Sequence, residues 1–377
     1  MCRARRRRTA YSVNVLFITS HGPLAAASRT RVFQYLPYLA AAGVKPTVLS
    51  VVPDRLLRAR YAGGRAYRVV YHLTVLWRTV QIVLSCLTCA GRFDAIVIQR
   101  VILLPPLAKL LGRIRRKVAF DFDDAIYLTD GFEQGVFSRL QGWLRRGAVA
   151  HTLSNVGHAI VENRYNRSYA TRYCPGASTI TGPVDTERYT PGAGASGDEV
   201  VLGWVGKQST ELYLNLIRPA LSEIGKRHPN VRLLLVGAEK STIPGLRVER
   251  RAWTLESELQ DLWQFDIGLM PLPDDAWTRG KGGYKLLQYM ALGIPAVASP
   301  VGVNSEIVAD GESGFLALSQ DDWVDCLSRL ICDEALRARM GSAGRLRAEQ
   351  RYSLKESSAR LLEILRELAR AGRKCRA

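Results

Sequence analysis

Short runs of apolar residues alternate with amphipathic segments along the first half of the chain. The runs are as long as strands and almost continuous, and the segments between them repeat apolar positions with the spacing of helices. Such an alternation is typical of a parallel sheet that is covered by helices. We predict strands at 13–19, 46–51, 93–99, 117–122 and 151–154, and helices at 30–42, 104–112 and 156–173.

The second half repeats this alternation after a segment rich in Gly, Pro, Ser and Thr, 181–197, which indicates a linker. We predict strands at 200–205, 231–236, 266–270 and 296–299, and helices at 212–228, 259–264 and 284–292. The fold class is therefore α/β, with two doubly wound halves. Two such halves joined by a linker predict a cleft at their interface. Ligands of such sheets bind beyond the carboxyl ends of the strands.

The composition of the 377 residues is that of a globular protein, since 47% are hydrophobic and 23% are charged. The seven cysteines have no paired C-x-x-C spacing, so we expect neither a zinc site nor a disulfide framework. The basic residues at 3–8 are not followed by an apolar region with a cleavage site. We therefore predict no signal peptide and a cytoplasmic protein.

The net charge of +19 is unevenly distributed along the chain. Residues 1–190 hold 28 Lys or Arg against 10 Asp or Glu, whereas the remaining residues hold 25 against 24. Before Asp94 the only acidic residue is Asp54. A field of one sign suggests an anionic partner such as a membrane surface, a phosphorylated acceptor or nucleic acid. Arginine bias in a GC-rich genome is the alternative, but it does not explain why acids are missing from one half.

The most apolar stretch, 69–91, is interrupted by His72, Arg78 and Gln81. Its longest uncharged run covers 79–91, which is short for a membrane-spanning helix of about 20 residues. We predict a helix that is either interfacial or packed internally on the sheet. With the arginines that precede it and the basic tail at 3–8, an interfacial helix would suit an anionic leaflet.

The segment 280–314 contains the most informative candidate chemistry. Its Gly-rich turn leads into a helix, so backbone N–H groups and the positive end of the helix dipole are available for a phosphate. Lys281, Lys285 and Gln288 have the spacing of one polar helix stripe. Two lysines at a helix amino terminus repel each other and would be stabilised by an anion between them. A solvated lysine face is the alternative.

The motifs "DIGLMPL", "KGGYKLLQYMALGIPAVAS", "VGVNSEIV" and "DGESGF" within 266–314 resemble the donor-binding region of the family 4 retaining glycosyltransferases, also described as glycosyl transferases group 1. The resemblance extends over "DFDDAIY", "GPVDTERYTP" and the helix after "RYSL". It implies the GT-B fold, in which two Rossmann-like domains face a central cleft. The expected parts are an acceptor domain 1–189, a linker 190–198, a nucleotide-sugar domain 199–350 and a carboxyl-terminal helix 351–377, whose return to the first domain is left open.

The chain departs from the family at two glutamates that lie eight positions apart and contact the donor sugar and the ribose. Aligning on "YMALGIPAV" places Gly280 and Gln288 at these positions. Gln288 can still accept from a ribose hydroxyl and also donate to one, whereas the contact of the first acid is lost. The resemblance implies as donor-binding residues Gly206, Lys207, Lys281, Gly282, Gly283, Tyr284, Lys285 and Gln288.

Asp121, Asp123 and Asp124 lie at the carboxyl end of a predicted strand. Crowded carboxylates repel each other and are more often functional than structural. A His-Asp pair follows this strand in the resembled family, which implies Asp123 and Asp124 as catalytic candidates, with Asp123 beside the anomeric centre. A metal pair and a helix N-cap are the alternatives. The family generally needs no metal, so we expect no metal and no cofactor besides the nucleotide sugar as co-substrate.

In each predicted domain, the loop after the first strand contains further candidate residues. Gly206 and Lys207 follow the strand 200–205, where a glycine and a cation can wrap a diphosphate and neutralise the leaving nucleotide. A helix N-cap at Ser209 or Thr210 would also fit this loop. In the first domain, Arg29 and Arg31 are candidates for binding a phosphate or uronate of the acceptor, or they are solvated surface.

These features together predict an enzyme that moves a sugar, with retention of configuration, from a nucleotide diphosphate sugar to a lipid-linked or surface-glycan acceptor. The expected place is the inner face of the cytoplasmic membrane, in polysaccharide biosynthesis of the cell envelope. A non-catalytic sugar-nucleotide binder is one alternative, because a family glutamate is lost. A nucleic-acid-binding protein is another, but no aromatic-basic motif or zinc-finger spacing supports a nucleic acid as partner.

Overall fold

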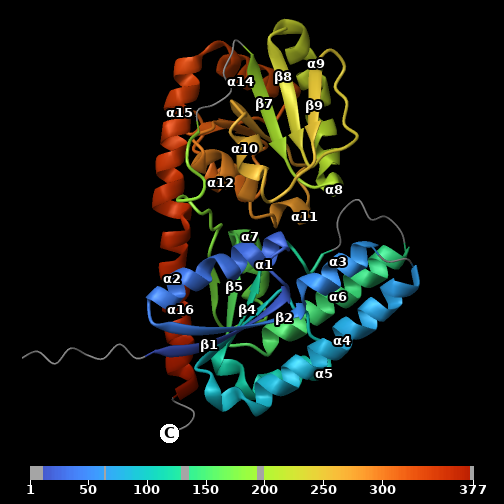
Figure 1. The fold of residues 1–377 in the computed structure, drawn as a ribbon, viewed down its shortest axis with the longest axis vertical. Coiled ribbons are helices and arrows are strands. Elements are labelled where there is room, and N and C mark those ends of the chain that lie inside the picture. Colours follow the sequence, from blue (N-terminus) through green and yellow to red (C-terminus); the bar gives the residue numbers. More distant parts are fainter. Residues whose placement is uncertain (1–11, 63–64, 129–135, 193–198, 374–377) are drawn as a thin grey trace, which may run out of the picture.

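The computed structural model describes residues 12–62, 65–128, 136–192 and 199–373, and gives no side-chain description for 59–69 and 136–143. It consists of two α/β domains stacked along the long axis of the molecule, each built on a six-stranded parallel sheet (Figure 1). The basic tail at 3–8 and most of the predicted linker 190–198 lie outside the described residues.

The first sheet has the strand order β2-β1-β3-β4-β5-β6. Strands β3, β4 and most of β5 are fully buried because helices cover both faces, which explains their continuous apolar runs. The strands are β1 (Val13–His21), β2 (Val44–Val52), β3 (Ala95–Gln99), β4 (Val118–Phe122), β5 (His158–Val161) and β6 (Ala177–Thr179). The helices are α1 (Ala26–Arg31), α2 (Leu36–Ala41), α3 (Asp54–Ala62), α4 (Arg65–Thr88), α5 (Pro105–Leu111), α6 (Val136–Ser154) and α7 (Arg164–Ala170), with 3-10 turns η1 (Phe33–Tyr35), η2 (Ala90–Arg92) and η3 (Gly112–Lys117).

The second sheet has the order β12-β11-β10-β7-β8-β9. Its strands are β7 (Val200–Val205), β8 (Val231–Val236), β9 (Arg247–Arg251), β10 (Ile267–Met270), β11 (Ala296–Ala298) and β12 (Gly314–Leu316). Its helices are α8 (Gln208–Glu211), η4 (Leu212–Ile217), α9 (Arg218–Arg227), α10 (Glu258–Leu262), α11 (Ala276–Arg279), α12 (Tyr284–Ala291), α13 (Asn304–Ile307), α14 (Gln320–Cys332), α15 (Glu334–Arg347) and the π-turn η5 (Ala348–Tyr352).

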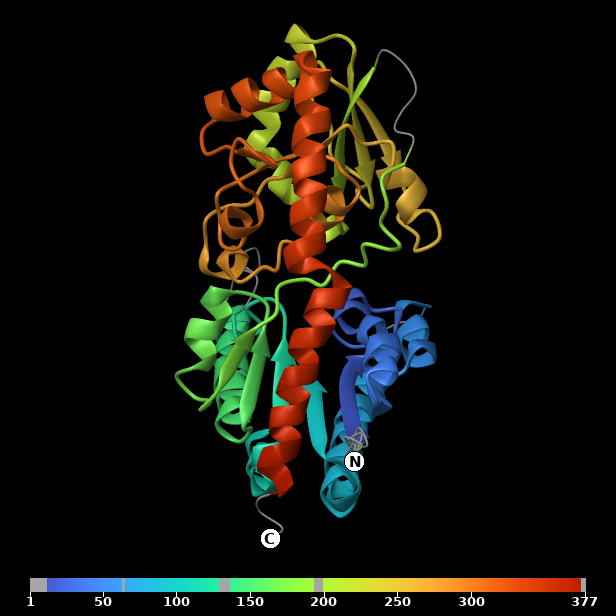
Figure 2. The same ribbon diagram turned by 90° about the vertical axis from the view of Figure 1, so that its left-hand side faces the viewer.

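The last helix, α16 (Leu354–Arg373), leaves the second domain and packs on the first. Its apolar face, which includes Leu361, Leu365 and Leu368, shares a core with Val15 and Phe17 of β1. Figure 2 shows α15 and α16 as a red column that passes both domains. The chain from the first to the second domain crosses beside it, because Val184 exchanges backbone hydrogen bonds with residues 352 and 354. Two segments therefore connect the domains.

The predicted strand at 151–154 is wrong, because these residues form the last turn of α6. Val149 and Leu153 are both fully buried, four residues apart, which is the spacing of one helix face. The strand follows as β5, and the predicted helix 156–173 shortens to α7. The predicted helices 30–42 and 212–228 are each divided, and a new helix starts just before Pro37 and Pro219, since proline is favoured in the first turn.

Candidate active site

The loop 280–283 of the second domain is docked against the first domain. A Cβ at Gly280 would lie 2.5 Å from the Cβ of Ala125, and one at Gly282 would lie 2.1 Å from the carboxyl carbon of Glu162. Asn163 Nδ2 donates to the carbonyl of Lys281 at 2.9 Å. Asn166 Nδ2 donates to the carbonyl of Gly280, also at 2.9 Å. The carboxyl ends of β4 and β5 therefore face this loop, and only residues without a side chain allow so close an approach.

Helix α12 begins directly after the loop, at Gly283, which adopts a left-handed conformation with φ of 66°. No side chain caps the amino terminus of α12. The first turn of a helix has N–H groups without intrahelical partners, and the helix dipole makes this end positive. An anion at this end would accept hydrogen bonds from these N–H groups and would be attracted by the helix dipole.

Lys285 extends from the first turn of α12 towards the end of β7. Its Nζ lies 3.9 Å from the ring centroid of Trp204, and a Cβ at Gly206 would come within 2.6 Å of it. Within the described residues, Lys285 makes no ion pair with a carboxylate. Burial lowers the pKa of Lys285 well below its usual range, and the charge of Lys281 lowers it further. An anion would restore a fully charged ammonium group here.

Two other predicted cations border the same region. Lys281 precedes α12 and therefore does not belong to a helix stripe; its Nζ lies 5.5 Å from the ring centroid of Trp277 and 5.8 Å from that of Tyr213. Lys207 is exposed beyond Gly206, at the start of α8. The structure thus brings together the predicted glycine and lysines of both loops.

The predicted N-cap at Ser209 or Thr210 is wrong, since both residues lie within α8. Instead, the carboxylate of Glu211 accepts hydrogen bonds from the backbone N–H groups of residues 239, 240 and 241, in the loop after β8. Although desolvation acts in the opposite direction, these hydrogen bonds lower the pKa of Glu211. The N–H groups of the loop 239–241 are therefore already bound to the carboxylate of Glu211. The amino terminus of α12 has no such side-chain partner among the described residues.

Gln288 is buried and its amide is engaged within the protein. Its Nε2 donates to the Tyr189 hydroxyl at 3.1 Å, and this hydroxyl donates to Glu258 at 2.6 Å. Trp253 Nε1 donates to the other carboxylate oxygen at 2.9 Å. Tyr284, at the start of α12, lies near Tyr189 and near Gln34 and Arg29 of the first domain, and burial raises its pKa to about 12. The predicted contact of Gln288 with a ribose is untested.

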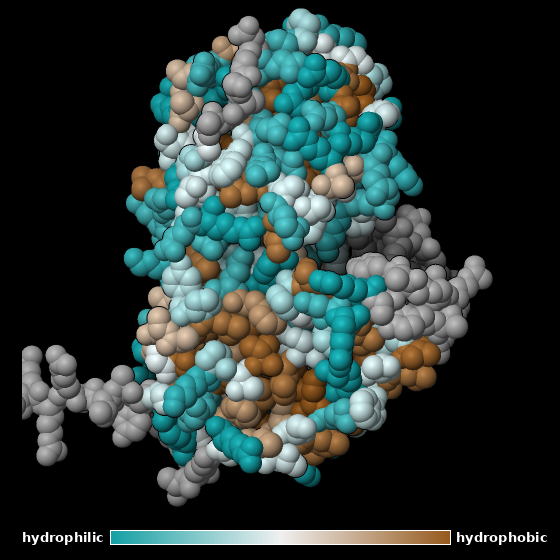
Figure 3. Space-filling model, in the orientation of Figure 1, coloured by the Kyte–Doolittle hydropathy of each residue, from teal (hydrophilic) through white to brown (hydrophobic). Residues whose placement is uncertain are grey.

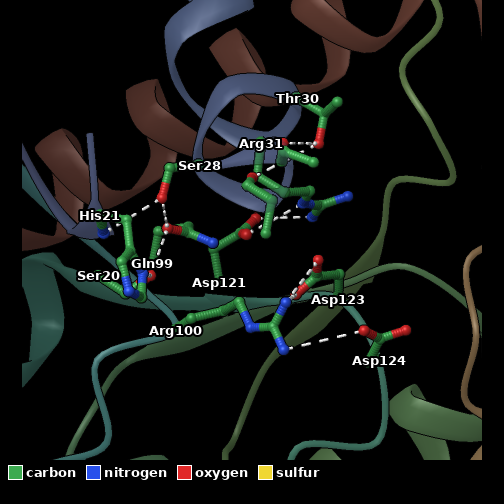
Figure 4. A network of polar contacts seen from close by, with 12 residues as sticks. Ser20, His21, Ser28, Thr30, Arg31, Gln99, Arg100, Asp121, Asp123 and Asp124 are labelled. Atoms are coloured by element: carbon green, nitrogen blue, oxygen red, sulfur yellow. Dashed lines mark hydrogen bonds and ion pairs between the residues drawn. The ribbon is translucent and has the colours of Figure 1, made fainter. Parts of the chain in front are cut away.

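Arg31 is almost fully buried. Its Nε and Nη2 donate to the two carboxylate oxygens of Asp121 at 3.0 and 2.6 Å (Figure 4). Its Nη1 donates to the carbonyls of residues 180 and 182. Burial would lower the pKa of Arg31, but Asp121 raises it above its usual range. Arg31 therefore fastens α1 to β4 and to the chain that leads to the second domain, rather than facing a ligand.

Arg29 lies at the interface between the two domains. Its Nη1 donates to the carbonyls of residues 23 and 24, and its guanidinium lies 5.9 Å from the ring centroid of Trp253 in the second domain. It is partly exposed, so a ligand between the domains can reach it.

Asp123 and Asp124 are paired with Arg100, which follows β3 (Figure 4). The distances from Arg100 to Asp123 are 3.0 and 3.1 Å, and that to Asp124 is 3.8 Å. Burial raises the pKa of Asp123, which Arg100 opposes and Asp124 reinforces. Up to residue 128 a turn rather than a helix follows, so the N-cap alternative has no helix to cap there. Among the described residues, no group of three or more metal-ligating side chains is positioned for a metal ion.

Glu162, at the end of β5, was not predicted. Its side chain is 6% exposed and lies against Gly282, and within the described part of the chain its carboxyl makes no hydrogen bond or ion pair. Burial raises its pKa to about 8; Arg31 opposes this, whereas Asp123 and its acidic neighbours reinforce it. The wrong strand at 151–154 concealed this residue, because it put Glu162 inside a helix rather than at the end of a strand.

Residues 199–333 match the family model described as "Glycosyl transferases group 1". A GDP-mannose-dependent alpha-(1-6)-phosphatidylinositol monomannoside mannosyltransferase of Mycolicibacterium smegmatis is 28% identical over 343 residues, which are 81% of this chain and 85% of the relative. A D-inositol 3-phosphate glycosyltransferase of Corynebacterium urealyticum is 25% identical over 222 residues, so the match spans about half the length of either protein.

Solved structures share the fold at low sequence identity. Sucrose-phosphate synthase from Thermosynechococcus elongatus has a TM-score of 0.68 at 16% identity, over 95% of this chain and 100% of that one. Anabaena Alr3699/HepE in complex with UDP has a TM-score of 0.63 at 16% identity, over 93% and 99%. The predicted fold is confirmed: the chain has the GT-B fold, and residues 199–333 of its second domain match the group 1 family model.

Proposed function

We propose that this protein is a glycosyltransferase that takes a sugar from a nucleoside diphosphate sugar. The observation that carries the proposal is Lys285, a partly buried cation without a carboxylate partner at the uncapped amino terminus of α12. The match to the group 1 model supports it, as do two relatives whose names specify glycosyl transfer. The base and the sugar are left open.

On the donor side, the diphosphate binds at the amino terminus of α12. Negative charge accumulates on its oxygens as the bond to the sugar breaks, and fixed N–H groups and cations stabilise this charge better than water does. Lys281 and Lys285 lie closest to this end of the helix, and Lys207 lies beyond Gly206. Because Trp204 packs on the amino group of Lys285, this side chain is held in position before the donor binds.

On the opposite side of the cleft, Asp123 stabilises the positive charge that develops at the anomeric carbon. Arg100 pairs with the carboxylate of Asp123, and this ion pair fixes the orientation of the Asp123 side chain. Burial raises the pKa of Glu162 to about 8, so its protonated carboxyl donates a hydrogen bond to the bound sugar. We propose transfer with retention and without a metal ion or other cofactor.

The acceptor binds to the first domain, with Arg29 as the residue that meets its anionic group. Arg31 is excluded from this role because all three of its nitrogens are engaged within the protein. The proposed acceptor is a lipid-linked or surface glycan. The Mycolicibacterium smegmatis relative, whose name specifies a phosphatidylinositol monomannoside, supports a lipid-linked one.

A second candidate, a sugar-nucleotide binder without catalysis, is favoured by Gly280, which leaves no acid at the first family position. Calorimetric titration of the purified protein with UDP, GDP, ADP and their sugars, followed by an assay of donor hydrolysis and transfer, tests both. Tight binding with turnover supports the glycosyltransferase. Tight binding without turnover on any acceptor supports the binder, and absence of nucleotide binding contradicts both.

A further inference from the structure

The outer face of α4 carries large apolar side chains that the cleft does not use. Val70, Leu73, Trp77 and Leu84 follow one another at helical spacing, so they form one stripe along the helix. Leu73 is 62% exposed and Trp77 is 59% exposed. We name these four residues the α4 stripe. Exposed apolar patches of this kind mark interaction sites.

The opposite face of α4 fastens the helix to the first domain. Tyr71, Val83 and Cys86 are part of its core, and Arg78 donates to the carbonyls of residues 50 and 51 at the end of β2. By length and composition, the helix segment 70–88 could cross a membrane. Only 22% of its most apolar window is buried in the protein. The helix therefore packs on the first domain with one face, as the internal alternative predicted, and leaves its other face exposed. A spanning helix would have to leave its core contacts, so the helix is held lengthwise on the surface.

The elements that pack against α4 carry exposed basic side chains. They are Arg55 and Arg58 of α3, Arg92 of η2 and Lys109 of α5, and Arg113 and Arg115 of η3 follow α5. In the described parts of 12–128, no acidic side chain is exposed. Figure 3 shows that apolar surface gathers on the lower domain, which contains α4. This face is therefore apolar with a basic border.

We propose that the α4 stripe docks the protein on an anionic lipid bilayer. The stripe enters the boundary between headgroups and acyl chains, and the basic side chains of α3, η2 and α5 contact lipid phosphates. Trp77 suits this depth because its ring is apolar and its N–H is polar. A second copy of the chain fits less well, because two identical basic faces without exposed acids would repel each other.

Helix α3, which carries Arg55 and Arg58, contacts the segment that leads to α1 and Arg29. The carboxylate of Asp54, at the start of α3, accepts a hydrogen bond from the backbone N–H of Leu24 in the loop that leads to Arg29. Membrane docking through α3 and α4 would therefore bring lipid headgroups to the acceptor loop. The inference itself does not depend on the proposed transfer reaction.

Vesicle flotation of the full-length protein tests the proposal. We expect the protein to float with phosphatidylglycerol vesicles, much less with phosphatidylcholine vesicles, and less at high salt. The double variant Leu73→Gln/Trp77→Gln should lose about tenfold or more in partitioning, because two large apolar side chains no longer enter the bilayer. Leu318→Gln, at an 81% exposed leucine of the second domain, is the matched control and should float like the unmodified protein.

The variant Arg55→Gln/Arg58→Gln tests the basic border separately and keeps α4 unchanged. It should weaken flotation with anionic vesicles only. Equal flotation of both double variants and the unmodified protein would overturn the proposal, as would absence of flotation of the unmodified protein. A dimer that the α4 variant dissociates would assign the stripe to a second copy. Nucleotide affinity without vesicles, measured on the same samples, shows separately whether the proposed function fails.

Discussion

At the scale of the residue, the proposed donor site depends on Lys285, which has no carboxylate partner within the described residues. A partly buried ammonium without a counter-charge is destabilising, and the proximity of Lys281 adds to the cost. Trp204 offsets a part of it through its ring. A bound anion would relieve the remaining cost, so we expect the residue that destabilises the fold to strengthen the binding of a diphosphate.

Lys285→Ala should therefore weaken the binding of a nucleoside diphosphate without destabilising the fold. Loss of a charge-assisted contact to a phosphate costs about 2 kcal/mol, which is about 30-fold in Kd. Calorimetric titration measures this. Lys226→Ala, at an exposed lysine of α9, is the control and should bind like the unmodified protein. Unchanged affinity in folded Lys285→Ala would contradict the donor site.

Asp123→Asn should reduce turnover much more than donor binding, because the proposed role of Asp123 lies in the transition state. Steady-state kinetics and calorimetric titration on the same variant separate the two effects. A variant that is destabilised but keeps its turnover would show that Asp123 acts only as the partner of Arg100. Turnover that a chelator abolishes and a divalent ion restores would favour a metal site.

The raised pKa of Glu162 predicts that the stability of the protein depends on pH. Its pKa is raised from 4.5 to about 8 in the folded protein, so between these values the folded state binds a proton that the unfolded state has released. Stability should therefore decrease as the pH rises from 4.5 to 8. In Glu162→Gln this decrease should be smaller. Urea denaturation of both proteins at several pH values measures it, and identical slopes would show that Glu162 is ionised in the fold.

At the scale of the element, the loop 280–283 acts as a contact between domains. Gly280 lies against Ala125 of the first domain, and this leaves no space for the glutamate that the resembled family has at this position. The acid that does approach the loop is Glu162, which comes from the other domain. The departure from the family pattern therefore has a steric reason in this chain.

Gly280→Ala should disturb this contact, because its Cβ would lie 2.9 Å from the backbone nitrogen of Ala125. We expect a stability loss of about 1 to 3 kcal/mol, as for other overpacked positions, together with weaker donor binding. Gly147→Ala is the control, since a Cβ there meets nothing within 4 Å and alanine favours the interior of α6. Thermal denaturation compares the two. Equal stability of Gly280→Ala and the unmodified protein would show that the loop moves freely.

At the scale of the whole molecule, α16 makes the first domain dependent on the end of the chain. Six side chains of α16 are buried in the core around β1: Leu354, Leu361, Ile364, Leu365, Leu368 and Ala369. Five of them are large, and each contributes about 1.5 to 3 kcal/mol on burial. Their sum is comparable with the total stability of a typical protein, about 5 to 15 kcal/mol.

A chain that ends at Tyr352 should therefore lose the fold of its first domain, with insolubility or loss of cooperative unfolding. Circular dichroism and sedimentation of the purified protein measure this. A chain that ends at Arg373 keeps all of α16 and should behave like the full-length protein. A soluble, cooperatively folded chain after the shorter truncation would show that the first domain completes its core without α16.

The elements whose signal is local could be predicted from the amino-acid pattern. Strands 200–205 and 231–236 have the observed bounds, because each is a continuous apolar run between polar turns. The two-domain α/β organisation, the GT-B fold and the glycine-lysine segment before α12 could also be predicted, since they rest on periodicity and on motifs contiguous in the chain. The strand at 151–154 failed because a short apolar run does not distinguish a strand from the last turn of a buried helix.

Which polar groups are paired and which remain available depends on the packing of distant segments. Arg31 is bound to Asp121 and Gln288 to Tyr189, whereas Lys285 has no carboxylate partner among the described residues. Glu162 faces a loop of the other domain. These pairs are about 90 or more positions apart in the chain, so no local pattern records them. Packing brings such residues together and sets their burial and charge environment, and this determines which side chains are free to bind a ligand.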